Sequence, residues 1–271
     1  MEEKSRGCLK QVALGCGGLL VVAVAVPVVL TVMILPPMNR AIEARADFEA
    51  LYGPQDAFVP PASGAPSPDR IDAFLSVRRA LAPACDDFWN AERSVAKLEA
   101  FDDQENISKI EVMKQAMSTS KTMMEMGPAI GRFFENRNRA LVDAGMGLGE
   151  YSYIYVVAYN DRILDPETEL QLFGPQVANG RVRQALASML KNQLEKLRRE
   201  GAQEEITRAV AVEVEALEKD PDRIPWQDGL PSGIESSLLP FRDRLDTAFC
   251  GSTAPFELLI NEKRFLAIES L

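Results

Sequence analysis

The segment Leu148–Leu164, LGEYSYIYVVAYNDRIL, decides the fold of this chain. Its apolar and aromatic residues fall on most sides of a helix drawn at about 3.6 residues per turn, so such a helix needs packing partners all around it. Tyr159, Asp161 and Arg162 near one end make it a poor membrane span. We therefore expect this segment to be the central helix of a soluble bundle.

The segments on both sides also carry apolar residues at helical spacing. Before the central segment, Phe74, Leu81, Phe88 and Val95 recur every seven residues, and a second segment runs from about residue 105 to Gly145. After it, helical patterns cover 182–197, 206–217 and 234–249. Outside 256–268, which fits either a hairpin or a helix, no alternation typical of strands occurs, so the sequence predicts an all-α fold.

The amino-terminal part of the chain predicts a transmembrane helix. No charged residue occurs between Lys10 and Arg40, and residues 12–35 are almost wholly apolar. As a helix they would rise about 36 Å, enough to cross a hydrocarbon core of about 30 Å. The apolar run is longer than that of a cleaved signal peptide, so we interpret residues 11–37 as a single-pass signal anchor.

Charges beside the anchor predict its orientation. The tail at residues 1–10 carries Lys4, Arg6 and Lys10, against Arg40 and Arg45 on the other side. The positive-inside rule therefore places the amino terminus in the cytoplasm and the rest outside the cell membrane, in the periplasm if the cell is bacterial. The remainder divides into a juxtamembrane helix at 38–52, a proline-rich linker or surface-wrapping segment at 53–68, and a helical domain at 69–271.

Composition argues against several classes of function. The chain has 40 acidic and 30 basic residues, a net charge of −10 and no histidine. The acidic balance argues against binding of nucleic acid, because such proteins need a basic surface for phosphates. Without imidazole there is no Ser-His or zinc-histidine constellation, and we expect no catalytic residues and no bound metal or cofactor.

Two groups of residues are candidates for contact with a partner. Gly15, Gly17 and Gly18 would let another helix approach the membrane span closely. Tyr151, Tyr155 and Tyr159 follow one another at a spacing of four, along one helix face. This stripe would form a partner surface or, with Glu150, border a ligand pocket; core packing is the competing interpretation.

Cysteine and serine–lysine patterns leave further alternatives open. Cys85 and Cys250 fall in the outer domain, where they would form a disulfide or remain buried thiols. Ser94/Lys97, Ser118/Lys121 and Ser188/Lys191 have the spacing of a serine–lysine dyad, but no accompanying motif.

Taken together, these patterns favour a non-catalytic accessory subunit. We expect a single-pass protein whose helical domain docks on and stabilises a larger membrane complex, with other membrane subunits and the bilayer as partners. Respiratory, photosynthetic, transport and secretion complexes fit equally well. The alternatives are an extracytoplasmic ligand-binding or sensory module that uses the tyrosine-rich helix, and an enzyme that uses carboxylates or a serine–lysine dyad.

Overall fold

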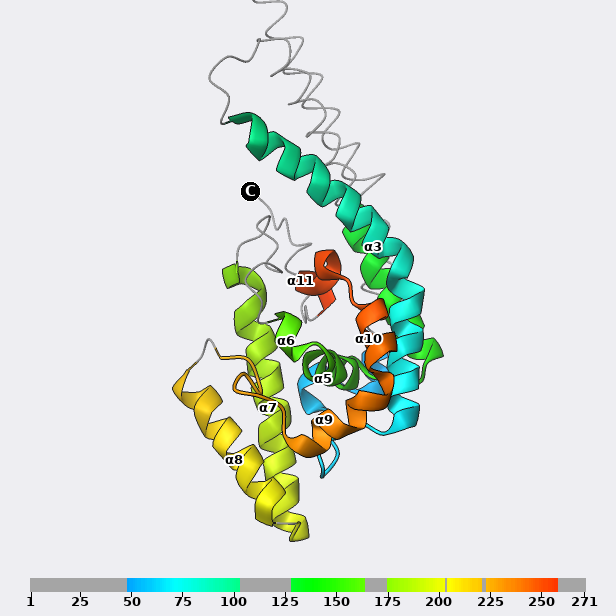
Figure 1. The fold of residues 1–271 in the computed structure, drawn as a ribbon. Coiled ribbons are helices and arrows are strands. Elements are labelled where there is room, and N and C mark those ends of the chain that lie inside the picture. The colour runs from blue at the N-terminus through cyan, green and yellow to red at the C-terminus, as the bar shows by residue number, and fades with distance from the viewer. Residues whose placement is uncertain (1–47, 103–127, 164–174, 203, 221–222, 258–271) are drawn as a thin grey trace, which may run out of the picture.

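The computed structural model describes residues 48–102, 128–163, 175–202, 204–220 and 223–257. Throughout these ranges the regular elements are helices, so the all-α prediction is confirmed for them (Figure 1). No helix in the described ranges is long and apolar enough to cross a membrane. The predicted tail at 1–10 and anchor at 11–37, with Gly15, Gly17 and Gly18, lie outside the described residues.

Helix α3 (Pro68–Asp102) runs along one side of the domain. Its start follows the expected pattern, because the carbonyl of Ser67 accepts hydrogen bonds from the amides of Arg70 and Ile71 and Pro68 occupies the first turn. The helix continues through Pro83. The apolar stripe of α3 is buried at Phe74, Leu81 and Phe88. Residues 128–143 form another helix, which contributes Phe133 and Phe134 to the same core.

Helix α5 (Leu148–Ala158) lies at the centre of Figure 1, with α3 on one side and α7 on the other. Nearly all its residues are buried, as its apolar character on all sides predicts. It ends earlier than expected, because Tyr159 leaves the helical conformation at φ −122° and ψ 23°. The predicted helix at 148–164 is therefore two helices, α5 and the short α6 (Asn160–Ile163).

Helices α7 (Pro175–Glu200) and α8 (Glu204–Lys219) form an antiparallel hairpin. Gly201 turns the chain at φ +63°, and the amide of Ala202 donates to the carbonyl of Leu197 at 3.1 Å, which closes the end of α7. Helix α7 contacts α5, whereas α8 lies on the outer side of α7.

The helix predicted at 234–249 is interrupted. The structure has α9 (Ser232–Leu238), a 3-10 turn η4 (Leu239–Phe241) and α10 (Arg242–Ala248) instead. Pro240 explains the break, since proline has no amide hydrogen and its ring crowds the preceding turn. The chain then forms the 3-10 turn η5 (Gly251–Thr253) and α11 (Ala254–Glu257), so the start of the ambiguous segment is helical.

The proline-rich segment after residue 52 follows the surface of the domain. It contains the 3-10 turn η2 (Gln55–Ala57), which contacts both α5 and α7. Gln55 Nε2 donates to Ser152 Oγ at 2.7 Å, and Tyr153 Oη donates to the carbonyl of Gly64 at 2.7 Å. The sequence allowed a linker or a segment that wraps over the surface. These contacts show that the chain wraps over the helices.

Candidate functional site

Arg78 lies on the apolar face of α3, one heptad after Ile71 and one before Cys85. Its side chain is only 2% exposed, so its charge needs partners inside the protein. Nε and Nη2 both donate to the carbonyl of Ala248, at 3.2 and 3.0 Å, and Nη1 donates to Tyr151 Oη at 3.2 Å. Arg78 therefore joins α3 to α5 and to the end of α10.

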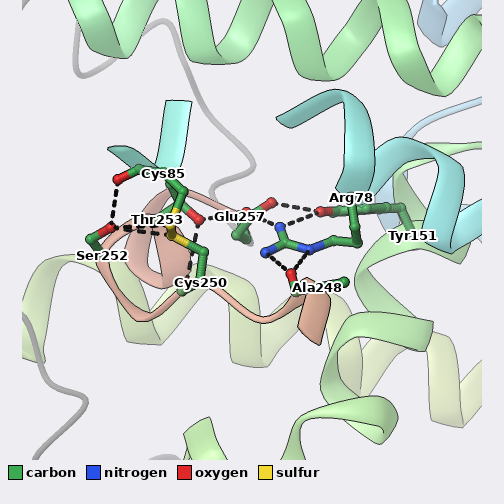
Figure 2. The surroundings of a disulfide bond; sticks show 8 residues. All are labelled: Arg78, Cys85, Tyr151, Ala248, Cys250, Ser252, Thr253 and Glu257. Carbon is green, nitrogen blue, oxygen red and sulfur yellow. Dashed lines mark hydrogen bonds and ion pairs between the residues drawn. A yellow bond between two sulfur atoms is a disulfide. The ribbon is translucent and has the colours of Figure 1, made fainter. Parts of the chain in front are cut away.

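The negative charge that pairs with Arg78 comes from Glu257, the last residue of α11. Glu257 is fully buried. Glu257 Oε1 forms an ion pair with Arg78 Nη1, and Tyr151 Oη donates to Glu257 Oε2 at 2.6 Å (Figure 2). Thr253 Oγ1 lies 2.8 Å from Glu257 Oε1. A buried ion pair is tolerated where hydrogen bonds satisfy its remaining atoms, and this carboxylate has them.

The charges in this network change the acidity of its members. Burial opposes the charge on Arg78, but the carboxylate of Glu257 and the neighbouring tyrosines outweigh it, so the pKa of Arg78 lies well above its ordinary value. Burial and the charge of Glu257 raise the pKa of Tyr151 well above its ordinary value. The arginine therefore stays charged, and the phenol keeps the proton that it donates.

A disulfide lies beside the ion pair. Cys85 on α3 is joined to Cys250, and Figure 2 shows Glu257 between this bond and Arg78. Of the two states that the sequence left open for these cysteines, the structure has the bonded one. Ser252 Oγ lies 3.4 Å from the carbonyl oxygen of Cys85 and donates to it, which adds a second link between α3 and η5.

The carboxyl-terminal segment is further held by the helix at 128–143. Arg137 Nη1 donates to the carbonyls of Phe256 and Glu257, at 3.1 and 3.3 Å. The ring of Phe256 packs against those of Phe88 and Phe133, with centroid distances of 4.8 and 6.4 Å. We name the ion pair, the side chains hydrogen-bonded to it and the disulfide the C-terminal clasp: Arg78, Cys85, Tyr151, Cys250, Thr253 and Glu257.

The structure corrects the prediction of a tyrosine surface. Tyr151, Tyr155 and Tyr159 are at most 1% exposed, and their rings pack on one another and on Phe74. Side chains therefore fill the space where the ligand pocket was expected, and the three rings belong to the core. A helix that is apolar on all sides has no free face for a tyrosine stripe to occupy, so core packing prevails.

Glu150, the proposed neighbour of that pocket, has a different role. Its carboxylate accepts two hydrogen bonds of 2.6 Å from Arg70, one from Nε and one from Nη2. This bidentate ion pair joins the start of α3 to the start of α5 and raises the pKa of Arg70. It is a partly exposed structural contact at the edge of the core.

The serine–lysine pattern forms no dyad where both side chains are described. Ser188 Oγ donates to the carbonyl of Gln184 at 2.8 Å, whereas Lys191 Nζ pairs with Glu218 at 2.8 Å. The other two pairs lie in segments whose side chains are not described. Within the described residues, no group of acidic or cysteine side chains is arranged to hold a metal ion.

Three apolar side chains are exposed at two places in the sequence: Leu51 and Tyr52 near the beginning of the described chain, and Val142 near the end of the helix at 128–143. Leu51 is 67% exposed, and Tyr52 and Val142 are each 39% exposed. Tyr52 lies against Gly147, where an added Cβ would be 3.2 Å from Tyr52 Cβ, and the carbonyl of Val142 accepts from the amide of nearby Gly145. We name Leu51, Tyr52 and Val142 the entry patch, because Leu51 and Tyr52 lie near the start of the described chain and Tyr52 lies against Gly147, five residues after Val142.

Sequence reasoning missed the clasp residues Arg78, Thr253 and Glu257. One signal was present, because a charged residue that interrupts an apolar stripe on a long helix must find a partner when that face is buried. No sequence pattern pointed to Glu257 as the partner. It is distant from Arg78 in the sequence, and it lies in the segment 256–268, which fitted either a hairpin or a helix.

These features describe an all-helical domain closed by a buried ion pair and a disulfide. Comparison of the chain with protein families, curated proteins and solved structures gives no match.

Proposed function

We propose that the protein is a non-catalytic, single-pass membrane subunit whose helical domain docks on a larger membrane assembly through the entry patch. The observation that carries the proposal is the exposure of Leu51 and Tyr52 at the start of the described chain and of Val142, five residues before the Gly147 that Tyr52 lies against. Exposed apolar side chains that cluster are typical of contact surfaces, whereas isolated ones need no explanation.

The predicted anchor supports the same proposal. The expected juxtamembrane helix at 38–52 has a length of about 22 Å. The entry patch at its end would therefore lie within reach of the parts of a membrane complex that project from the bilayer. A tyrosine at that level suits the boundary between protein, headgroups and water, since its ring is apolar and its hydroxyl polar.

The disulfide supports an extracytoplasmic domain. Disulfides persist in oxidising compartments and are rare in the cytosol of most cells. The Cys85–Cys250 bond agrees with the charge bias around the predicted anchor, which favours a cytoplasmic amino terminus.

Native-membrane extraction with a matched pair of variants tests the proposal. Leu51→Asp should shift the protein from a larger complex to a free species in native gel electrophoresis, because a carboxylate in the entry patch would lose solvation on docking. Val212→Asp is the control, since Val212 is similarly exposed, at 61%, but lies on the outer helix α8. The proposal fails if the wild-type protein leaves native membranes as a clean monomer, or if both variants behave alike.

A further inference from the structure

We propose that a cleft at the carboxyl end of α5 binds a small organic ammonium ion that carries an apolar body. The cleft has a volume of about 360 Å³. It lies between the end of α5, α6 and the α9–η4–α10 segment. This volume is at the lower end of the range for ligand sites, so the occupant is a small molecule.

Apolar side chains form one part of the cleft wall. Val157, Leu238 and Leu245 line it and otherwise belong to the core, while Leu230 and Leu239 line it from the turn before α9 and from η4. An aliphatic or aromatic group of the ligand would be removed from water against these side chains, which favours binding in proportion to the area buried.

The polar part of the wall is mainly acidic. Asp161, Glu235 and Asp246 line the cleft, and Arg242 is the basic residue among its lining side chains. Arg242 Nη2 lies 3.5 Å from Asp161 Oδ2. Asp246 Oδ1 lies 2.6 Å from Nη2 of Arg162, a residue that does not line the cleft. The side chain of Glu235 forms no ion pair with any described residue, so the lining keeps an excess of negative charge.

The end of α5 adds to this negative field. Val157 and Ala158, the last residues of α5, line the cleft. The carboxyl end of a helix carries a partial negative charge, which attracts cations within about one turn. The acidic side chains and the carboxyl end of α5 therefore both favour a positively charged ligand.

A constrained turn beside the cleft provides an internal reporter. Asn160 Nδ2 donates to the carbonyl of Pro225 at 2.9 Å, and Gly229, three residues after Trp226, lines the cleft. Trp226 between them has φ +62°, which is unusual for a bulky residue, and its amide donates to Glu213 Oε1 at 2.9 Å. Trp226 is 5% exposed. Trp89 is the second tryptophan of the chain, so Trp89→Phe leaves Trp226 as the single fluorophore.

The test titrates the full-length Trp89→Phe protein, in nanodiscs of uncharged lipid, with 2-phenylethylammonium chloride. Trp226 fluorescence and calorimetry are the two readouts. The neutral 2-phenylethanol and the anion 3-phenylpropionate are matched probes of similar shape. We expect saturable binding of the cation at low ionic strength, about tenfold weaker binding of the alcohol, and none of the anion, because the charge preference comes from the acidic lining.

Variants separate this cleft from unspecific attraction to an acidic protein. Asp161→Asn with Glu235→Gln should weaken binding of the cation about tenfold, as expected for two solvent-exposed charges. Glu205→Gln, an exposed carboxylate on α8, should leave it unchanged. Circular dichroism checks that each variant is folded. Equal binding of cation and alcohol, no effect of the double variant, or absence of saturation by both readouts would each overturn the proposal.

Discussion

A buried guanidinium is tolerated only where acceptors surround it, and Arg78 meets this condition through residues from three distant parts of the chain. Its acceptors are the carbonyl of Ala248, the hydroxyl of Tyr151 and the carboxylate of Glu257. Tyr151 also donates to Glu257, whereas the hydroxyl of Tyr155, one turn later on α5, is buried without a hydrogen-bond partner among the described residues. Two tyrosines of equal burial therefore have opposite polar environments.

This contrast predicts opposite effects of the same substitution. Tyr151→Phe removes a hydrogen bond to a buried carboxylate and should lower the free energy of unfolding by about 1.5–3 kcal/mol. Tyr155→Phe removes a hydroxyl that has no hydrogen-bond partner in the described part of the chain, so we expect no loss and even a gain in stability. Urea unfolding followed by circular dichroism measures both changes. Equal losses in the two variants would contradict the proposed hydrogen-bond network.

The buried tyrosines also predict how stability depends on pH. Burial raises the pKa of Tyr159 to about 12, and burial likewise raises the pKa values of Tyr151, Tyr153 and Tyr155. In the unfolded chain these phenols lose their protons near pH 10, so the unfolded state binds fewer protons above that pH. The contribution of Tyr159 to stability is therefore complete below about pH 10 and is lost as the pH rises through about 12, whereas the contributions of the other three are lost over a range that extends to higher pH.

Urea unfolding between pH 8 and 12 measures this dependence, with tyrosinate absorbance as a second signal. Tyr159→Phe should give a shallower fall of stability with pH than the wild type. If the buried tyrosines ionise while the protein remains folded and its stability stays constant, the prediction is wrong.

At the scale of elements, the proline-rich segment determines how closely the chain can cover α5. An added Cβ on Gly149 would be 2.5 Å from Phe58 Cβ and would also meet the carbonyl oxygen of Gln55. Phe58 Cβ is bonded directly to the backbone, and the Gln55 oxygen is part of it. Neither atom can therefore move without a shift of the proline-rich segment. Gly149 therefore permits the contact between α5 and η2.

Gly149→Ala should destabilise the protein, although alanine is the better helix former. We expect a loss of about 1–3 kcal/mol, the usual cost of overpacking a well-packed site. Gly233→Ala is the matched control, because this helical glycine of α9 has open space around an added Cβ. That control should gain up to about 1 kcal/mol from helix propensity. Thermal unfolding compares the two, and a stable Gly149→Ala variant would show that the segment does not lie against α5.

At the scale of the whole molecule, the C-terminal clasp joins the first long helix to the last described residues. The disulfide links positions separated by 165 residues, so it restricts the unfolded chain strongly. Phe256, Arg137 and Glu257 add contacts in the folded state. Covalent and non-covalent contacts therefore hold the same segment against α3.

Removal of the disulfide should lower the free energy of unfolding by about 2–5 kcal/mol, because it releases a long loop in the unfolded state. Cys85→Ser with Cys250→Ser tests this by urea unfolding, and reduction of the wild type should reproduce the loss. Cys8→Ser with Cys16→Ser is the control, since these cysteines belong to the tail and the predicted anchor. An unchanged midpoint after removal of Cys85 and Cys250 would exclude a stabilising bond.

Helical periodicity by itself determined the all-α class, the central position of α5 and the approximate extent of α8, because apolar spacing reports which faces a helix must bury. It predicted α7 only from residue 182, whereas the helix begins at Pro175. It missed the breaks at Tyr159 and Leu239–Phe241, although Pro240 was a visible reason for the second. The anchor at 11–37 and the docking function remain predictions.

Only the tertiary structure decided the role of the tyrosines, the partners of Arg78 and the bonding of Cys85 to Cys250. Each depends on contacts between residues far apart in the chain: Tyr151 and Glu257 are separated by 106 positions, and Arg78 and Glu257 by 179. A local pattern reports that a side chain will be buried, but the identity of its neighbour depends on how the helices pack. The sequence could therefore predict a buried face on α3, while the packing selected the carboxylate that makes a charge on that face tolerable.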